Sequence, residues 1–165
     1  MSQHVKASQP LVPSVLDRLL DAEPDVKREP EKSRVQILRD LKISVRRDLE
    51  SLLNTRKRAV PFADDLNELE VSLVNYGIPD FTGQQLSGPA AREEFRRKVE
   101  AVIRVYEPRF KTVKVTLVEN DSPIERTLRF RIDGLLYAEP APEPVVFDTA
   151  LEPSTGSFEV TRVGR

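Results

Sequence analysis

Between residues 33 and 54 the apolar positions follow the period of an α-helix. They recur every three or four residues and therefore share one side of the helix: Leu38, Leu41, Val45, Leu49 and Leu52. Ser33 and Gln36 fit a capping box, in which each side chain satisfies a free backbone N–H of the first turn. The pattern predicts a helix of about 20 residues with one buried face, beginning at Ser33.

A second strong helix is predicted for residues 89–106. Its apolar residues again share one face: Ala91, Phe95, Val99, Val102, Ile103 and Tyr106. Ser87 is the expected cap before Pro89, because proline suits the first turn of a helix. Pro108 ends the helix, because the residue before a proline is pushed out of the α region.

The pattern between these two helices is weaker. Apolar residues at helical spacing predict a short helix: Leu66, Leu69, Leu73 and Tyr76. Gly77 would close it, because a residue without Cβ permits a left-handed cap. A strand over residues 69–76 remains the alternative, since short apolar runs fit either element. Residues 78–89 are expected to form a loop.

After residue 110 the period changes from helical to alternating. Two strands are predicted with inward residues at every second position: Val113, Val115 and Leu117, then Leu128, Phe130 and Ile132. A turn at 120–123 joins them, a bulge at Gly134 extends the second, and a proline link at 139–144 leads to further strands over 145–149 and 156–163. Helices precede strands, so the predicted class is α+β, with amphipathic helices packed on one face of a mainly antiparallel sheet formed by the C-terminal half.

The chain ahead of the first strong helix carries less pattern. Residues 1–13 are polar and contain two prolines, so we expect a flexible tail. Residues 14–21 have apolar side chains at helical spacing, enough for two turns that dock on the domain or on a partner. Residues 22–32 are charged and contain prolines, as linkers often do. We therefore expect a tail over 1–13, a short helix and linker over 14–32, and a single domain over 33–163.

Composition narrows the class of protein. The 165 residues include no cysteine, which excludes disulfides and thiolate metal sites and fits a reducing compartment. Charge is balanced, with 26 Lys and Arg against 27 Asp and Glu, so no basic excess points to nucleic acid. No window approaches the roughly 18 apolar residues of a membrane span, and the N-terminus lacks a signal-peptide run. We expect a soluble protein that neither enters a membrane nor binds nucleic acid.

Little catalytic equipment is present. The one histidine, His4, lies in the expected tail, so a Ser/His triad, a Cys/His pair and a zinc site are excluded. No glycine-rich phosphate-binding pattern occurs. Paired carboxylates, as in glycoside hydrolases, remain available among the acids, but the chain has no tryptophan and three tyrosines to stack on sugars. We expect no catalytic residue, no cofactor and no metal.

One short segment, Tyr106-Glu107-Pro108-Arg109-Phe110, combines a fixed backbone with charge at the junction of the second helix and the first strand. Glu107 and Arg109 flank a proline that locks the backbone, so both side chains are held in fixed directions. The guanidinium fork suits bidentate recognition of a carboxylate or of backbone carbonyls. Two interpretations stay open: an internal salt bridge that pins helix to sheet, or a docking contact for a partner protein.

Four segments together carry a family resemblance: SVLDRLLD at 14–21, SVRRDLESLLNTR at 44–56, SLVNYGIPDF at 72–81 and YEPRF at 106–110. YEPRF, after an amphipathic helix and before an alternating strand, resembles the baseplate-wedge family shared by contractile phage tails and type VI secretion systems. The other segments resemble its bacterial secretion branch, the TssE subunits. The likeness covers roughly residues 14–163.

The resemblance implies a non-enzymatic structural component of the cytoplasmic baseplate, placed at the cytoplasmic face of the inner membrane when assembled. Its implied partners are TssF, TssG and TssK in the baseplate, beneath a contractile sheath of TssB and TssC. Glu107, Pro108 and Arg109 are implied to seat on the wedge core, and a β-element near the chain end to engage the first sheath ring. We assign that element to residues 157–163, with Phe158 and Val160, because a terminal strand has unpaired backbone groups that can extend a neighbouring sheet.

Two other functions remain open. Some members of the family carry a lysozyme-like label, so one alternative is a peptidoglycan hydrolase. The other is a soluble regulatory adaptor that shares the fold. Under the baseplate interpretation, we expect alanine at Glu107 or Arg109 to leave the fold intact and to abolish assembly.

Overall fold

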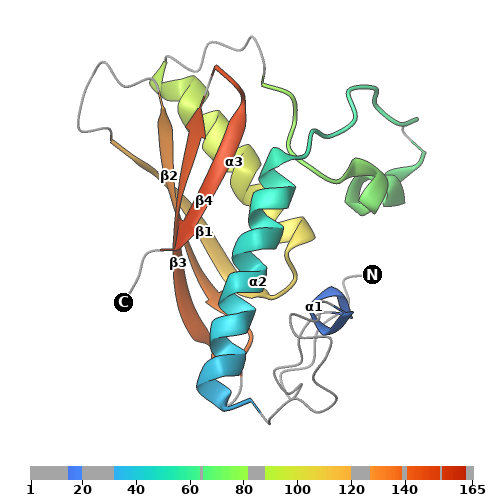
Figure 1. Cartoon of the computed structure of the whole chain (residues 1–165). Coiled ribbons are helices and arrows are strands. Elements are labelled where there is room, and N and C mark those ends of the chain that lie inside the picture. The colour runs from blue at the N-terminus through green and yellow to red at the C-terminus, as the bar shows by residue number, and fades with distance from the viewer. Residues whose placement is uncertain are drawn as a thin grey trace.

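The computed structural model describes residues 15–19, 32–63, 65–81, 88–119, 127–138, 141–152 and 154–162. Within these ranges the elements in chain order are α1 (Val15–Leu19), α2 (Arg34–Asn54), the 3₁₀ helices η1 (Asn67–Val71) and η2 (Leu73–Asn75), α3 (Pro89–Tyr106), β1 (Phe110–Val118), β2 (Leu128–Leu136), β3 (Glu143–Glu152) and β4 (Ser157–Arg162). Helices precede strands, as predicted (Figure 1).

The four strands form one antiparallel sheet in which they lie in sequence order, β1-β2-β3-β4. The register places Val115, Ile132 and Phe147 in one row, and all three are buried. Helix α3 packs over β1 and α2 over β4, with the two helices side by side (Figure 1). The predicted α+β class, with helices on one face of an antiparallel sheet, is confirmed. The edges of the sheet are β1 and β4.

Helix α2 begins with the predicted capping box. The hydroxyl of Ser33 accepts from the N–H of Gln36 at 3.4 Å, and the amide of Gln36 accepts from the N–H of Ser33 at 2.7 Å. Three residues at the centre of the predicted stripe are buried: Val45, Leu49 and Leu52. Leu53, which the pattern did not include, is buried beside them. Because burial of each such side chain stabilises the fold by roughly 1.5–3 kcal/mol, packing on the sheet is what holds this helix.

Helix α3 has the predicted bounds, but its cap differs. The N-cap is Gly88, which makes no side-chain capping bond, and Ser87 lies outside the described residues. Pro89 occupies the first turn, where its fixed φ suits a helix. The helix ends because Pro108 excludes the α region for Glu107, which has φ of −117° and ψ of 82°.

Four aromatic rings form the centre of one half of the core: Phe81, Phe95, Phe130 and Phe158. Phe81 meets Phe95 edge to face with ring centroids 4.9 Å apart, a geometry worth about 0.5–1.5 kcal/mol beyond area burial. Since Phe81 follows the 3₁₀ helices, this contact fastens the segment between α2 and α3 to the sheet and α3.

That intervening segment forms η1 and η2, so the predicted short helix is right in position but is 3₁₀, and the alternative strand is wrong. Ser72 separates the two turns in an extended conformation, and its hydroxyl donates to the carbonyl of Leu69 at 2.9 Å. Gly77 has φ of +112°, and a Cβ there would lie 2.5 Å from the carbonyl oxygen of Thr55. Glycine is required because a short parallel bridge pairs Arg56 with Ile78 at this point.

The irregularity predicted in β2 lies in β1 instead. Strand β2 continues past Gly134 in unbroken register, whereas the register shifts between Phe110 and Thr112. The ring of Phe110 covers Gly134, and a Cβ there would lie 2.4 Å from a ring carbon. The glycine therefore makes room for an aromatic side chain and does not form a bulge. Strand β3 begins at Glu143, inside the predicted proline link.

Several predicted features lie outside the described residues: the tail over 1–13 with His4, the linker over 22–31, the loop over 82–87, the turn over 120–123 and residues 139–140 of the proline link. Helix α1 falls within the predicted helix at 14–21. The division into tail, linker and single domain stays a prediction. No helix in the described part of the chain is both long and apolar enough to cross a bilayer.

Candidate protein-interaction site

The chain passes from α3 to β1 through a tight corner, residues 106–110. The N–H of Glu107 still donates to the carbonyl of Ile103 at 2.9 Å, and the carbonyl of Glu107 accepts from Phe110 N–H at 3.3 Å. Pro108 lies between these bonds, is exposed, and needs no donor. The backbone of the corner is thus closed by its own hydrogen bonds, and the turn projects Pro108 outward.

The carboxylate of Glu107 is buried, with 5% of the residue exposed, and turns back onto Arg109. Its Oε1 accepts from Nε of Arg109 at 2.7 Å and from the backbone N–H of Arg109 at 3.2 Å, and its Oε2 accepts from Nη2. This bidentate ion pair is the strongest geometry available to an arginine and a carboxylate.

The other side of the Arg109 guanidinium reaches helix α2. Nη1 donates to the hydroxyl of Ser44 at 2.9 Å, and Nη2 donates to Asp48 at 2.6 Å. Burial alone would lower the pKa of Arg109, but the hydrogen bonds and charges of Glu107 and then Asp48 raise that pKa above its ordinary value. The side chain keeps 24% of its surface exposed. The corner is therefore fixed to α2 by a charged arginine that stays partly exposed.

The network continues from α2 to helix α1. The carboxylate of Asp17 accepts from the hydroxyl of Ser44 at 2.7 Å and from Nη2 of Arg47 at 2.9 Å. Arg47 also donates to Asp48 at 3.1 Å and 3.2 Å. Burial would lower the pKa of Arg47, but the hydrogen bonds of Asp17 and Asp48 raise it. Helices α1 and α2 and the corner thus share one set of ion pairs.

The aromatic residues of YEPRF also have internal partners. The hydroxyl of Tyr106 donates toward the carbonyls of Ser72 at 3.1 Å and Glu70 at 3.3 Å, and its ring meets that of Tyr76 edge to face at 5.3 Å. Phe110 is buried beside Gly134. The motif therefore joins the 3₁₀ segment, α2 and the sheet at a single point.

These contacts bear directly on the two interpretations of the corner. The internal salt bridge is present, but it pins the corner to α2 and not simply helix to sheet. Glu107 has no accessible carboxylate for a partner, whereas Pro108 and one side of Arg109 are accessible. Docking through the corner stays a prediction, and in this structure Pro108 and Arg109 are the residues that can make the contact.

Strand β4 is at the sheet edge, but both backbone groups of Phe158 and the carbonyl of Val160 already have hydrogen-bond partners on α2. The N–H of Phe158 donates to Oδ1 of Asn54 at 2.8 Å, and its carbonyl accepts from Nδ2 of Asn54 at 2.9 Å. The carbonyl of Val160 accepts from Nη1 of Arg46 at 3.2 Å. Both side chains are buried in the core, with 3% and 1% exposed. Helix α2 therefore covers this edge with its own polar side chains.

The opposite edge, β1, is covered by α3 in the same manner. Glu100 accepts from the N–H of Val115 at 3.0 Å, and Arg96 donates to the carbonyl of Val115 at 2.9 Å. Arg104 donates to the carbonyl of Val113 at 3.4 Å. Burial would raise the pKa of Glu100, but the Val115 N–H and the two arginines lower it overall.

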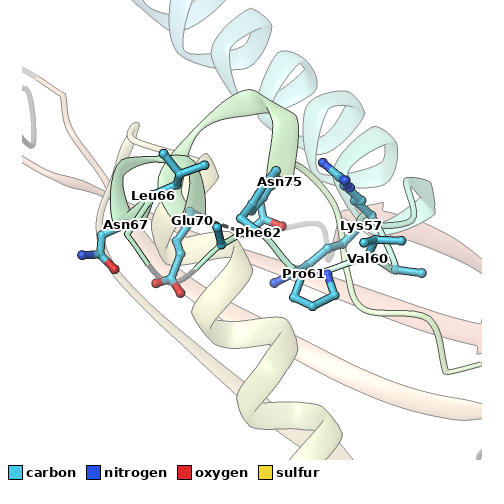
Figure 2. Close-up of a pocket in the computed structure, with 11 residues that line it drawn as sticks. Lys57, Val60, Pro61, Phe62, Leu66, Asn67, Glu70 and Asn75 are labelled. Carbon is cyan, nitrogen blue, oxygen red and sulfur yellow. Dashed lines mark hydrogen bonds between the residues drawn. The ribbon is translucent and has the colours of Figure 1, made fainter.

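A pocket of about 420 Å³ lies between the stretch after α2 and the 3₁₀ helices. Lys57, Val60 and Pro61 come from one wall and Leu66, Asn67 and Glu70 from the other (Figure 2). Among the described residues that line it, Glu70 is the single carboxylate. No cluster of three or more His, Cys, Asp or Glu side chains suited to a metal occurs among the described residues.

Sequence reasoning missed Ser44, Asp48, Arg47 and Asp17 as parts of the corner. One signal was available: Ser44 follows Leu41 by three residues and precedes Val45, so it interrupts the buried stripe of α2 with a hydroxyl. A buried polar residue in such a stripe requires a hydrogen-bond partner. The identity of that partner, Arg109, could not be read from spacing along α2.

The profile of the family described as "Baseplate wedge protein gp25" matches residues 39–141. A chain of a solved structure titled "The baseplate complex from the type VI secretion system" is 21% identical, with a TM-score of 0.47, and the alignment covers 69% of this chain and 96% of that chain. No curated protein matches the sequence. Because the family profile spans more than half of the chain and includes the whole corner, this chain belongs to the gp25 family of baseplate wedge proteins, as the resemblance predicted.

Proposed function

We propose that this chain is a non-enzymatic structural subunit of a type VI secretion baseplate, which binds other wedge subunits and helps to nucleate the contractile sheath. The observation that carries the proposal is the family match over residues 39–141. The secretion branch is proposed from the likeness of segments 14–21, 44–56 and 72–81 to TssE subunits. Such a subunit would act in the cytoplasm, at the inner face of the inner membrane.

The corner supports a docking role because it is rigid before a partner arrives. Ion pairs to Glu107 and Asp48 fix the guanidinium of Arg109, and Pro108 restricts the backbone beside it. A surface that is already ordered loses little conformational entropy on binding. We therefore propose that Pro108 and the accessible side of Arg109 contact the wedge subunits TssF and TssG, with TssK nearby, while Glu107 orients Arg109 from inside.

The sheath proteins TssB and TssC are proposed to meet the chain at Phe158 and Val160 of β4. Strand addition there requires Asn54 and Arg46 of α2 to release the strand backbone first. Each hydrogen bond released costs about 1 kcal/mol, which a new ladder of strand hydrogen bonds can offset. Sheath docking would therefore compete with an internal contact.

The pocket supports the non-enzymatic part of the proposal. Glycoside hydrolysis requires two carboxylates on either side of the bond that is cleaved. In the described part of the chain, the lining contributes Glu70 alone. At the corner, Glu107 and Asp48 are both engaged by Arg109.

The test is co-purification of the full chain, at native expression level, with mass identification of the proteins recovered. Pro108→Asp adds a charge at the exposed tip of the corner and removes no hydrogen bond. Ala90→Asp adds the same charge at an exposed site in the first turn of α3, at the far end of that helix from the corner. We expect the wild-type chain and Ala90→Asp to recover wedge subunits and Pro108→Asp to lose them, with all three still folded by circular dichroism at the temperature of the assay.

The possible failures of this test are separable. A wild-type chain that recovers no baseplate protein contradicts the proposed function as a whole. Recovery of wedge subunits by Pro108→Asp at the wild-type level contradicts only the assignment to the corner. Cell-wall clearing by the purified protein would restore the hydrolase alternative, and recovery of partners outside the baseplate would favour the adaptor.

A further inference from the structure

Helix α1 contacts α2 through a carboxylate at the corner. Asp17 accepts from Ser44 at 2.7 Å with one oxygen and from Arg47 at 2.9 Å with the other. Ser44 in turn accepts from Arg109 at 2.9 Å, so its hydroxyl hydrogen is directed to Asp17. The two donors span both oxygens of one carboxylate, which is the arrangement of a binding site for that group.

The apolar side chains described in α1 lie mostly in solvent. Val15, Leu16 and Leu19 are 73%, 53% and 74% exposed. Helix α1 is also too short to be stable alone, since isolated helices of fewer than about 12 residues are marginal in water. The polar contacts of Asp17 are therefore the main described attachment of α1, and contacts of this kind between partly exposed groups are weak.

Release of α1 would leave two donors without this acceptor. Ser44 is 4% exposed with α1 in place, and its hydroxyl would lose the acceptor that Asp17 provides. Arg47 would keep Asp48 alone. A donor that loses its acceptor in a partly buried site favours any ligand that supplies a new one.

We propose that Ser44 and Arg47, beside Arg109, form a binding site for an acidic side chain of a wedge subunit, and that Asp17 occupies this site in the free chain as a displaceable cover. Without Asp17, the positive charges of Arg47 and Arg109 are balanced by the carboxylates of Asp48 and Glu107. A site with no excess positive charge suits the single charge of a carboxylate better than the double charge of a phosphate. The proposal rests on the proposed function, because the partner is a wedge subunit. The proposal adds that the partner presents an acidic side chain and that this side chain must displace Asp17.

The first experiment uses the isolated full chain and measures amide hydrogen exchange by mass spectrometry. Asp17→Ala removes the carboxylate, and Asp17→Glu keeps one. The matched control is Asp40→Ala, which removes another acid of α2, one that pairs with Lys32 just ahead of the helix. We expect faster exchange over α1 in Asp17→Ala alone. Unchanged exchange in Asp17→Ala would overturn the assignment of Asp17 as the attachment of α1.

The second experiment measures the affinity of the same variants for the wedge subunits recovered with the wild-type chain. A competing internal acid lowers the apparent affinity of its replacement, so Asp17→Ala should bind about five-fold more tightly, a change of about 1 kcal/mol. Asp17→Glu and Asp40→Ala should bind like the wild type. Ser44→Ala combined with Asp17→Ala, where no internal acid competes, should bind more weakly than Asp17→Ala alone.

The outcomes separate this inference from the function beneath it. Unchanged or weaker binding by Asp17→Ala, with the wild-type chain still bound to wedge subunits, overturns the cover and leaves the baseplate function in place. Weaker binding would instead assign α1 to the interface itself. A wild-type chain that binds no wedge subunit contradicts the proposed function, and with it the inference that the site binds an acidic side chain of such a subunit.

Discussion

At the scale of single residues, Arg109 connects two elements because its guanidinium serves acceptors on both. Glu107 holds one side of the fork, and Ser44 and Asp48 of α2 hold the other. Loss of the arginine would leave the Glu107 carboxylate buried without its counter-ion, which costs more than the pair itself contributes. Alanine at either residue would therefore alter folding as well as docking, contrary to the expectation from sequence.

We expect Arg109→Met and Glu107→Gln each to lower the free energy of unfolding by about 3 kcal/mol, because each strands a buried partner. The double variant should lose less than the sum of the two by at least about 1 kcal/mol, because the two side chains interact directly. Urea unfolding at neutral pH measures all three differences. Additive losses would contradict the direct coupling of the pair.

The corner also indicates what a sequence can and cannot give at this scale. Pro108 acts on its own neighbours, so the end of α3 and the turn were predictable from local rules. The direction of the two charged side chains was not, because the acceptors on α2 lie 61 and 65 residues from Arg109 in the chain. Two interpretations were therefore open until the helices were placed.

At the scale of elements, polar side chains of α2 and α3 form hydrogen bonds with the backbone of the two edge strands. The charges along α3 fit ordinary i,i+4 pairs on a solvated helix face, and such pairs are present. Arg96, Glu100 and Arg104 additionally bind the outer backbone of β1. The apolar stripes that place each helix were predictable from period alone. The binding of strand backbone by the polar side chains was not, because it depends on which strand lies at the edge of the sheet.

Glu100 makes the edge contact of β1 dependent on pH. Its pKa is lowered in the folded state, so its contribution to stability is present above its ordinary pKa of 4.5 and is lost as the pH falls through the lower folded value. We expect Glu100→Gln to cost about 1–2 kcal/mol near neutral pH. The difference from wild type should shrink as the pH falls below about 4.5.

Urea unfolding of both proteins over a series of pH values tests this expectation. The matched control is Glu94→Gln, which removes an exposed carboxylate that pairs with Lys98 on the same helix and binds no strand. Its effect should be smaller at every pH. A loss in Glu100→Gln that persists undiminished in acid would mean that the charge of Glu100 is not what holds β1.

At the scale of the whole molecule, both edges of a four-stranded sheet are covered by helix side chains. Open edge strands readily pair with other chains, and polar or charged groups at the edge are one of the ways in which proteins prevent this. Asn54 and Arg46 act at β4, and Arg96 and Glu100 act at β1. Such contacts disfavour edge-to-edge pairing of two copies of this chain.

Asn54 is the sharpest test of this arrangement, because its amide alone satisfies both backbone groups of Phe158. We expect Asn54→Ala to lose about 1–2 kcal/mol of stability, from three hydrogen bonds, two to Phe158 and one to the carbonyl of Glu50. It should also self-associate with rising concentration, as the freed edge pairs with that of a second copy. Sedimentation velocity measures the association, and Asn67→Ala, at an exposed asparagine of η1, is the control. Asn54→Asp keeps the acceptor for the Phe158 N–H but places a carboxylate oxygen against the Phe158 carbonyl, so it too should be less stable than the wild type. If Asn54→Ala is less stable yet remains monomeric at every concentration, then Asn54 only fastens α2 to β4, and something other than its amide protects the edge at which the sheath is proposed to dock.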